Sequence, residues 1–378
     1  ADSGSRFACM KTCTEKIFFD LPLTLESGSI LPFFELMVET YGELNSVKDN
    51  AVLVCHAFSG NHHAAGEKSE ETKAGWWDQM VGDGKTIDTS KYFVVSLNNL
   101  GGCHGSSGPI SVDPTTNLPF GAAFPAVSVQ DWVSAQKHLL DHFKIDSWEM
   151  VAGGSLGGMQ ALQWAISYPD KLKKAAIIAS SSKISSQNIA LNEVAREMIR
   201  KDENFFDGNY LAQGSKPKQG LKAARMLGHI TYLSESSMSK RFGRKLQNPE
   251  TRIDTKVSYE VENYLQYKGE QFAETFDANS YILMTKAMDT FDPAKDFGQD
   301  LVECFKQIQA KLFIASFNSD WLFPKEYGKD IQISAVKAGV RSSYVELEGE
   351  YGHDSFLFHS DNYSASLQNF LETNDELS

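Results

Sequence analysis

A serine surrounded by glycines is the residue of this sequence best suited to chemistry. The apolar run of residues 148–152 ends in Gly153-Gly154-Ser155-Leu156-Gly157, and residues 159–168 continue with the composition of a helix. A sharp strand-to-helix turn of this G-x-S-x-G type exposes the serine hydroxyl and requires glycine where side chains would clash. Taken alone, the pattern is also compatible with an ordinary glycine-rich turn or a phosphate loop.

Two further residues could complete a catalytic triad with Ser155. Asp320 follows the apolar run of residues 311–316, and His353 follows the run of residues 343–347. Each residue therefore lies just beyond the carboxyl end of an expected strand, where side chains converge. His353 would take the proton of the Ser155 hydroxyl, and Asp320 would orient the imidazole and stabilise its charged form. The competing interpretations are a loop histidine and an aspartate that caps a helix.

Backbone amides near Ser155 are expected to stabilise a developing oxyanion. The first donor is the amide of Leu156. The second is expected in the loop after the buried strand of residues 51–57, with Phe58 as the candidate. Cys103 is an alternative nucleophile, but it lies in a glycine-rich loop and not on an elbow.

These side chains need a scaffold, and the order of apolar runs indicates which one. Strand-length runs alternate with helical patterns over residues 17–180 and 301–378, which predicts an α/β domain with a mostly parallel central sheet and helices on both faces. Residues 181–300 lose the β-branched runs and gain helix formers and charges, which predicts an inserted helical lid over the site. The serine, acid, histidine order within this alternation is that of the α/β-hydrolase fold.

Charge and hydropathy exclude several classes of protein. The 378 residues include 36 Lys and Arg against 49 Asp and Glu, a net charge of −13, so binding to nucleic acid or to an anionic membrane is not expected. No apolar stretch approaches the length of a membrane span. Residues 1–16, an expected N-terminal tail, lack the apolar centre of a signal peptide, which favours a cytoplasmic location. Met10 is a candidate natural start, which would make residues 1–9 foreign to the native chain.

Cysteine and histidine spacing does not indicate a metal site. The five cysteines are scattered and odd in number, which predicts free thiols in a reducing compartment. Cys9 and Cys13 lack the second pair that a zinc site requires. His62 and His63 resemble a metal pair, but no third ligand is suitably spaced, so a solvated loop is the preferred interpretation.

Short segments spread over most of the chain match one enzyme family. They are HAFSG (56–60), GWWD (75–78), NLGGC (99–103), GSSGP (105–109), GGSLGGMQAL (153–162), ARMLG (224–228), FDANSY (276–281), SDWLF (319–323) and GHD (352–354). With them, the sequence resembles the homoserine O-acyltransferases of methionine biosynthesis, the MetX type within the α/β-hydrolase superfamily. The resemblance covers nearly the whole chain from Phe18 onward.

The resemblance implies a ping-pong acyl transfer. Ser155 would attack an acyl-CoA thioester, and L-homoserine, deprotonated by His353, would then collect the acyl group. Acyl-CoA and L-homoserine would be the substrates, no cofactor would be bound permanently, and a homodimer is expected. Arg225 matches the family's substrate-binding arginine and suits the homoserine carboxylate. Asp354 matches a substrate-binding acid that could hold the homoserine ammonium group.

The acyl group depends on the residue after the Asp-Trp pair. Residues 61–66 and 98–102 resemble the succinyltransferase branch, in which arginine typically follows that pair. This chain has Leu322, as in the acetyltransferase branch, and leucine offers no charge partner to a succinyl carboxylate. We therefore expect an O-acetyltransferase, with an O-succinyltransferase as the alternative. A serine esterase with the same triad and a non-enzymatic binding module are the remaining alternatives.

Overall fold

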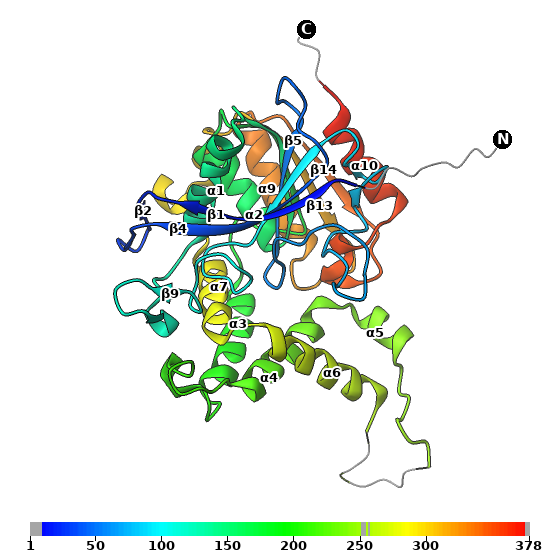
Figure 1. Cartoon of the computed structure of the whole chain (residues 1–378). Helices are drawn as coiled ribbons and strands as arrows, with labels where there is room; N and C mark the ends of the chain where they lie inside the picture. Colours follow the sequence, from blue (N-terminus) through cyan, green and yellow to red (C-terminus); the bar gives the residue numbers. More distant parts are fainter. Residues whose placement is uncertain (1–9, 251–254, 256–257, 375–378) are drawn as a thin grey trace, which may run out of the picture.

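A mixed sheet forms the centre of the computed structural model, which describes residues 10–250, 255 and 258–374 (Figure 1). In spatial order, its eight strands are β1 (Thr12–Phe19), β4 (Phe34–Tyr41), β8 (Phe93–Leu97), β5 (Ala51–Cys55), β11 (Trp148–Gly154), β12 (Leu172–Ile178), β13 (Lys311–Phe317) and β14 (Ser342–Leu347). Strand β4 pairs antiparallel with β1 and β8, whereas the strands from β8 to β14 pair in parallel. The predicted mostly parallel sheet is confirmed, with its antiparallel part at one edge.

Side-chain alternation along the strands divides the apolar interior into two layers. In β5, Leu53 and Cys55 face one layer, while Val52 and Val54 face the other. The first layer includes side chains of α1 (Val129–Phe143), α2 (Leu156–Ser167) and α9 (Lys325–Lys337). The second includes side chains of α10 (Asp361–Glu372). Helices thus cover both faces of the sheet, as the α/β-hydrolase fold requires.

The N-terminal segment departs from the expectation of a tail. Strand β1 begins at Thr12 and pairs with β4 from Thr12 opposite Tyr41 to Phe19 opposite Phe34. The prediction of a tail is therefore wrong for residues 12–16, because they pair in register with residues 37–41 of β4 although their side chains are mostly exposed. The prediction about residues 1–9 lies outside the described residues.

Short ribbons and turns complete the sheet domain. They are β2 (Leu23–Thr24) with β3 (Ile30–Leu31), β6 (Val81–Gly82) with β7 (Ile87–Asp88), β9 (Val112–Asp113) with β10 (Leu118–Pro119), and the 3₁₀ turns η1 (Gly121–Ala123) and η4 (Gly352–Leu357).

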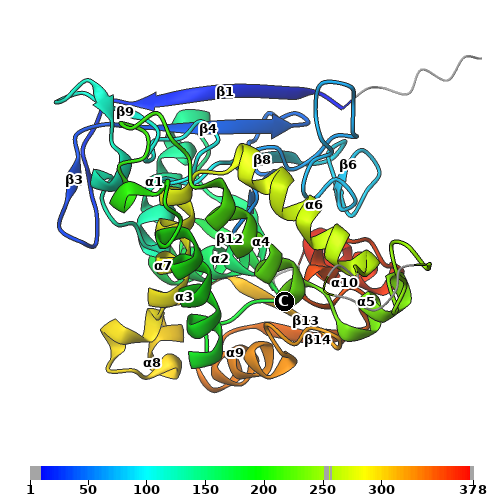
Figure 2. The same cartoon turned by 90° about the horizontal axis from the view of Figure 1, so that it is seen from below.

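Helices fill the interval between β12 and β13. They are α3 (Ser186–Arg200), η2 (Phe206–Gly208), α4 (Lys218–Tyr232), α5 (Glu235–Arg241), α6 (Glu260–Thr275), α7 (Ala278–Thr290), η3 (Pro293–Phe297) and α8 (Leu301–Phe305). Ser185 and Asp277 cap α3 and α7 with their side chains, which satisfies amides at the two helix starts. In Figures 1 and 2, α3, α4, α6 and α7 lie together outside the sheet. Among the described residues, no helix is long and apolar enough to span a bilayer.

A buried ion pair fixes α10 to the sheet. The Lys174 ammonium on β12 lies 2.9 Å from a carboxylate oxygen of Glu149 on β11 and donates to the carbonyl of Leu371 at 2.7 Å. The Tyr363 hydroxyl, also on α10, donates to the carbonyl of Phe356 at 2.9 Å. Because Phe356 belongs to η4, which carries His353, this packing also supports the functional site.

Lys174→Met is expected to lower the free energy of unfolding by about 3 kcal/mol, because it leaves the Glu149 carboxylate buried without its closest cation. Lys173→Met is the matched control: its ammonium lies 3.2 Å from the other oxygen of Glu149, but its side chain is 56% exposed. We expect a loss of less than about 1 kcal/mol for this control. Urea denaturation of both variants measures the difference, and equal losses would contradict the account.

Candidate active site

The turn around Ser155 has the backbone geometry of a nucleophile elbow. Ser155 lies between β11 and α2 with φ 54° and ψ −120°, a conformation that side-chain-bearing residues rarely adopt. A Cβ on Gly157 would lie 2.2 Å from the carbonyl oxygen of Cys55, and one on Gly153 would lie 2.4 Å from the carbonyl carbon of Gly157. Glycine is therefore required at both positions for α2 to start so close to β5.

The structure brings together the three side chains that the sequence singles out. The Nε2 atom of His353 lies 2.7 Å from the Ser155 hydroxyl oxygen, and its Nδ1 atom lies 2.7 Å from a carboxylate oxygen of Asp320. All three residues are buried. The residues come from the turn after β11, the loop after β13 and the 3₁₀ turn after β14, so the parallel sheet gathers them at one edge.

Asp320 and His353 are held from two sides. The second carboxylate oxygen of Asp320 accepts the backbone amides of Leu322 at 3.1 Å and Phe323 at 2.9 Å. The ring of Phe323 stacks on the imidazole of His353, with 4.8 Å between the centroids. Asp320 therefore presents one oxygen to the imidazole and has the other satisfied by the backbone, which fixes its orientation.

Two backbone amides lie free beside the serine. Leu156 is the first residue of α2, and Phe58 lies in the loop after β5; neither amide donates a hydrogen bond to the described part of the chain. The start of α2 adds the positive end of a helix dipole to this position. The Phe58 ring packs edge-to-face on Tyr281, with 4.7 Å between centroids, which anchors its loop to α7.

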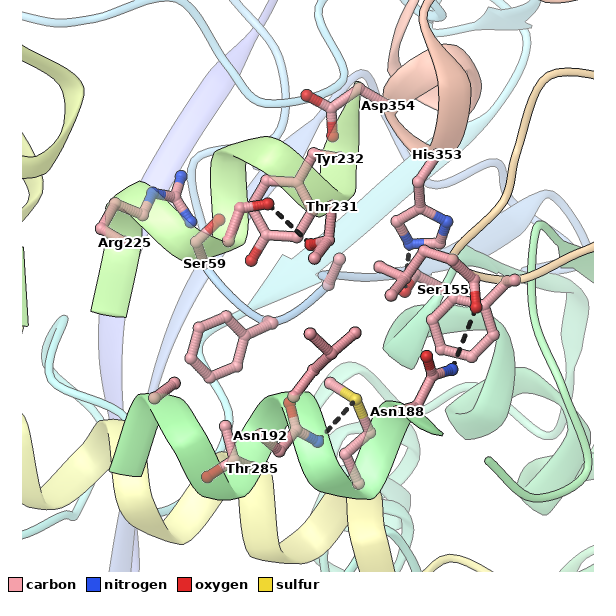
Figure 3. A pocket seen from close by; sticks show the side chains of 18 of the residues that line it. Ser59, Ser155, Asn188, Asn192, Arg225, Thr231, Tyr232, Thr285, His353 and Asp354 are labelled. Atoms are coloured by element: carbon pink, nitrogen blue, oxygen red, sulfur yellow. Dashed lines mark hydrogen bonds between the residues drawn. The ribbon is translucent and has the colours of Figure 1, made fainter. Parts of the chain in front are cut away.

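A pocket of about 180 Å³ opens in front of Ser155 and His353. The loop after β5 lines it together with α3, α4 and α7, and Figure 3 shows Arg225 of α4 on the other side of the view from Asn192 of α3. The helical insertion therefore supplies much of the lining. It contributes polar side chains that no sequence motif singled out, among them Asn188, Asn192 and Thr285.

Arg225, on α4, lines this pocket with unpaired donors. Its Nε and Nη1 atoms are buried and have no hydrogen-bond partner in the described residues. Its guanidinium carbon lies 4.6 Å from the centre of the Phe272 ring and 5.3 Å from that of Tyr232. Stacking holds the guanidinium plane in place, while its free N–H groups remain available to a bound anion.

Asp354 follows His353 in the sequence and also lines the pocket. Figure 3 shows Asp354 and Arg225 on either side of Tyr232. Burial raises the pKa of the Asp354 carboxyl to about 6, and the charges of His353 and Arg225 partly oppose the rise. No hydrogen bond to its carboxylate is formed by the described residues, so this acid too is free to bind a ligand.

Leu322 lines the same pocket as Ser155. It is half-buried, and its backbone carbonyl accepts a hydrogen bond from the side-chain amide of Asn188 at 3.0 Å. Its side chain is apolar, and Met288 from α7 adds a second apolar side chain to the pocket lining.

The other candidate residues lie elsewhere. Cys103 does not line the pocket, and burial raises the pKa of its thiol to about 12, which disfavours a nucleophilic thiolate. His63 bonds to the Glu39 carboxylate at 2.7 Å. Within the described ranges, no group of three metal-binding side chains is placed to hold an ion. Cys13, Cys55, Cys103 and Cys304 are free thiols, while Cys9 lies outside the described residues.

Comparison with known proteins identifies the family. Residues 50–360 match the family model of the alpha/beta hydrolase fold. The chain is 51% identical to the homoserine O-succinyltransferase of Neisseria gonorrhoeae, over 96% of this chain and 96% of that protein. It is also 51% identical to the homoserine O-succinyltransferase of Marinobacter nauticus, over 94% of this chain and 94% of that protein.

Solved structures share the fold but bear the names of two kinds of enzyme. Homoserine O-acetyltransferase from Bacillus anthracis superposes with a TM-score of 0.89 at 27% identity, over 98% of this chain and 99% of that one. Esterase E22 superposes with a TM-score of 0.85 at 28% identity, over 95% of this chain and 100% of that one. Because the 51% identity extends along almost the entire sequence, the chain belongs to the homoserine O-acyltransferase family of α/β-hydrolase-fold enzymes.

Proposed function

We propose that this protein transfers an acyl group from acyl-CoA to the hydroxyl of L-homoserine through an acyl-Ser155 intermediate. One observation carries the proposal: the pocket of the Ser155 hydroxyl also contains an unpaired guanidinium, Arg225, and an unpaired carboxyl, Asp354. An α-amino acid carries the complementary carboxylate and ammonium groups. The names of the relatives that are 51% identical support the same acceptor.

The first half-reaction charges the serine. His353 accepts the Ser155 proton at Nε2, 2.7 Å away, while the serine oxygen attacks the thioester carbonyl. The oxyanion that forms would lie against the free amides of Leu156 and Phe58. When the tetrahedral intermediate collapses, the C–S bond breaks and His353 returns its proton to the CoA sulfur. Asp320 stabilises the imidazolium throughout but stays ionised.

The second half-reaction uses the same groups in reverse. The homoserine hydroxyl gives its proton to His353 and attacks the acyl carbonyl, and the Ser155 oxygen leaves with the proton that His353 carries. Arg225 would hold the substrate carboxylate as a bidentate partner, and Asp354 would hold its ammonium. These contacts would place the homoserine hydroxyl beside the acyl-Ser155 ester, in the position that water would otherwise take.

Exclusion of water separates this activity from that of an esterase with the same triad. We infer that the helices of residues 181–300 act as a lid, because α3, α4 and α7 contribute to the lining of the pocket that contains the serine. Closure of this lid over bound homoserine would protect the acyl-enzyme from hydrolysis. The esterases among the similar structures show that the fold alone does not decide the acceptor. The amino-acid-binding pair favours the transferase.

The proposed acyl group is acetyl. Arg225 is the one guanidinium or ammonium group among the described residues that line the pocket, and homoserine would occupy it. A succinyl carboxylate would then be buried beside Leu322 and Met288 without a cation, which is costly. The names of the 51% identical relatives favour succinyl, whereas that of the Bacillus anthracis structure favours acetyl. We give more weight to the side chains that would touch the acyl chain.

The donor preference can be measured with acetyl-CoA and succinyl-CoA at a fixed concentration of homoserine. We expect kcat/KM to be at least about tenfold higher for acetyl-CoA, equivalent to about 1.4 kcal/mol of discrimination.

Leu322→Arg should raise the relative use of succinyl-CoA, and Leu322→Met is the size-matched control that should not. CoA release should depend on homoserine. A large wild-type preference for succinyl-CoA would refute the acetyl assignment, and release that ignores homoserine would favour an esterase.

The affinity for homoserine should depend on pH through Asp354. Burial raises the pKa of this carboxyl to about 6. Above that pH the carboxylate that would bind the homoserine ammonium is ionised, and as the pH falls through about 6 it becomes protonated and this interaction is lost. The KM for homoserine should therefore rise by roughly tenfold between pH 7 and pH 5. Asp354→Asn should raise this KM at every pH and flatten its pH dependence. Formation of the acyl-enzyme needs His353 but not Asp354. The rate of this step should therefore be the same in Asp354→Asn as in the wild type, which serves as the control.

A homodimer in the cytoplasm completes the proposal. Exposed apolar side chains on the helical insertion, such as Ile189 and Val194 on α3 and Ile230 on α4, favour this part as the contact between copies. Sedimentation at micromolar concentration should give twice the chain mass, and Val194→Glu should shift it toward one chain mass. A wild type that sediments as a monomer would refute the dimer.

A further inference from the structure

A second cavity, of about 500 Å³, adjoins the catalytic pocket. It lies between the end of α4, the helices α5 and α6, and the segment around η4. Asp354, the residue after His353, lines both cavities. We refer to the second one as the basic cavity.

Cations without carboxylate partners line the basic cavity. The guanidinium carbon of Arg241 lies 4.5 Å from the centre of the Tyr264 ring, and among the described residues Arg241 and Lys268 form no ion pair with a carboxylate. Burial lowers the pKa of the Lys268 ammonium, and the positive charges of Arg241 and Arg225 lower it further. Cations held this close together, without a counterion, are arranged for an anionic ligand.

Neither of the two carboxylates at the basic cavity forms an ion pair with Arg241 or Lys268 among the described residues, although the charge of Asp354 partly opposes the lowered pKa of Lys268. Glu350 is exposed and, among the described residues, its carboxylate pairs with Lys240, with 3.7 Å between nitrogen and oxygen. Asp354 belongs equally to the catalytic pocket. A further cation, Lys73, lies close enough to depress the pKa of Lys268 and comes from the loop that also gives Trp76 to the catalytic pocket. Positive charge therefore continues from the basic cavity to the rim of the catalytic pocket.

An aromatic pair lies at the same cavity. The rings of Tyr351 and Phe358 are 4.4 Å apart between centroids, and Tyr351 is 41% exposed. An exposed aromatic face beside unpaired cations suits a ligand that combines a planar base with phosphate groups. The overall net charge of −13 would otherwise repel such a ligand, so a local cluster of cations is needed.

We propose that the basic cavity binds the phosphate groups of acyl-CoA, with Arg241 and Lys268 as their partners and Tyr351 beside the adenine. The inference rests on the proposed function, since it assumes that the thioester reacts at Ser155. The phosphates would be held at the basic cavity while the pantetheine arm runs past Asp354 to the serine. The phosphates thus supply binding energy far from the reacting carbonyl.

Two thioesters distinguish a phosphate site from a general structural role. Acetyl-CoA carries the phosphates, whereas acetyl-pantetheine carries the same thioester without them. We expect Lys268→Met and Arg241→Gln each to raise the KM for acetyl-CoA at least tenfold, to change kcat less than twofold and to leave kcat/KM for acetyl-pantetheine unchanged. Lys268→Arg should retain most of the affinity. Lys286→Met, on the exposed face of α7, is the matched control and should behave as wild type.

Adenosine 3′,5′-bisphosphate tests the source of the anion. It should compete with acetyl-CoA in the wild type and bind at least tenfold more weakly to Lys268→Met. Inorganic phosphate that binds the site and changes activity without competing with acetyl-CoA would overturn the proposal in favour of a regulatory anion site. An equal loss with both thioesters, or an unchanged KM for acetyl-CoA, would also overturn it. A wild type that acylates homoserine from neither thioester would instead refute the proposed function.

Discussion

The hydrogen-bonded chain from Asp320 through His353 to Ser155 joins parts of the molecule that lie far apart in sequence. His353 is 198 residues from Ser155 and 33 from Asp320, yet both contacts are 2.7 Å. Such short contacts require that β11, β13 and β14 keep their register and that η4 be fixed behind them. The packing of α10 against the sheet and η4 provides the second condition. Much of the fold can therefore be understood as support for one proton-transfer path.

The proposed function requires a hydrolase scaffold to favour an acceptor other than water. A triad and an oxyanion site activate a serine but do not choose between water and an alcohol. In the proposed function, the choice falls to the groups that would bind the acceptor, and these come from two parts of the chain. Arg225 belongs to the helical insertion and Asp354 to the sheet domain, so homoserine would bridge the two parts. Binding of the acceptor would then favour the closed arrangement in which water is excluded.

Sequence patterns predicted the sheet, its helices and the triad because each has a local signature. The buried strands are continuous apolar runs. Glycine is required at positions 153 and 157 because a Cβ there would lie only 2.2–2.4 Å from backbone atoms. Strand β1 was missed over residues 12–16 because its exposed face is polar and resembles a tail. Helix α9 also lacked a recognised pattern. Asn188, Asn192 and Thr285 could not be foreseen, since they enter the pocket only through the packing of α3 and α7.

The central claim is that Ser155 carries the acyl group between two substrates. Mass spectrometry of the intact protein, quenched rapidly after mixing with acyl-CoA, measures this directly. The account predicts a mass increase of one acyl group on Ser155 that persists without homoserine and disappears, with formation of O-acylhomoserine, when homoserine is added. Ser155→Ala should show no increase. Transfer to homoserine without any acylated protein, or an acyl group on another residue, would contradict the account.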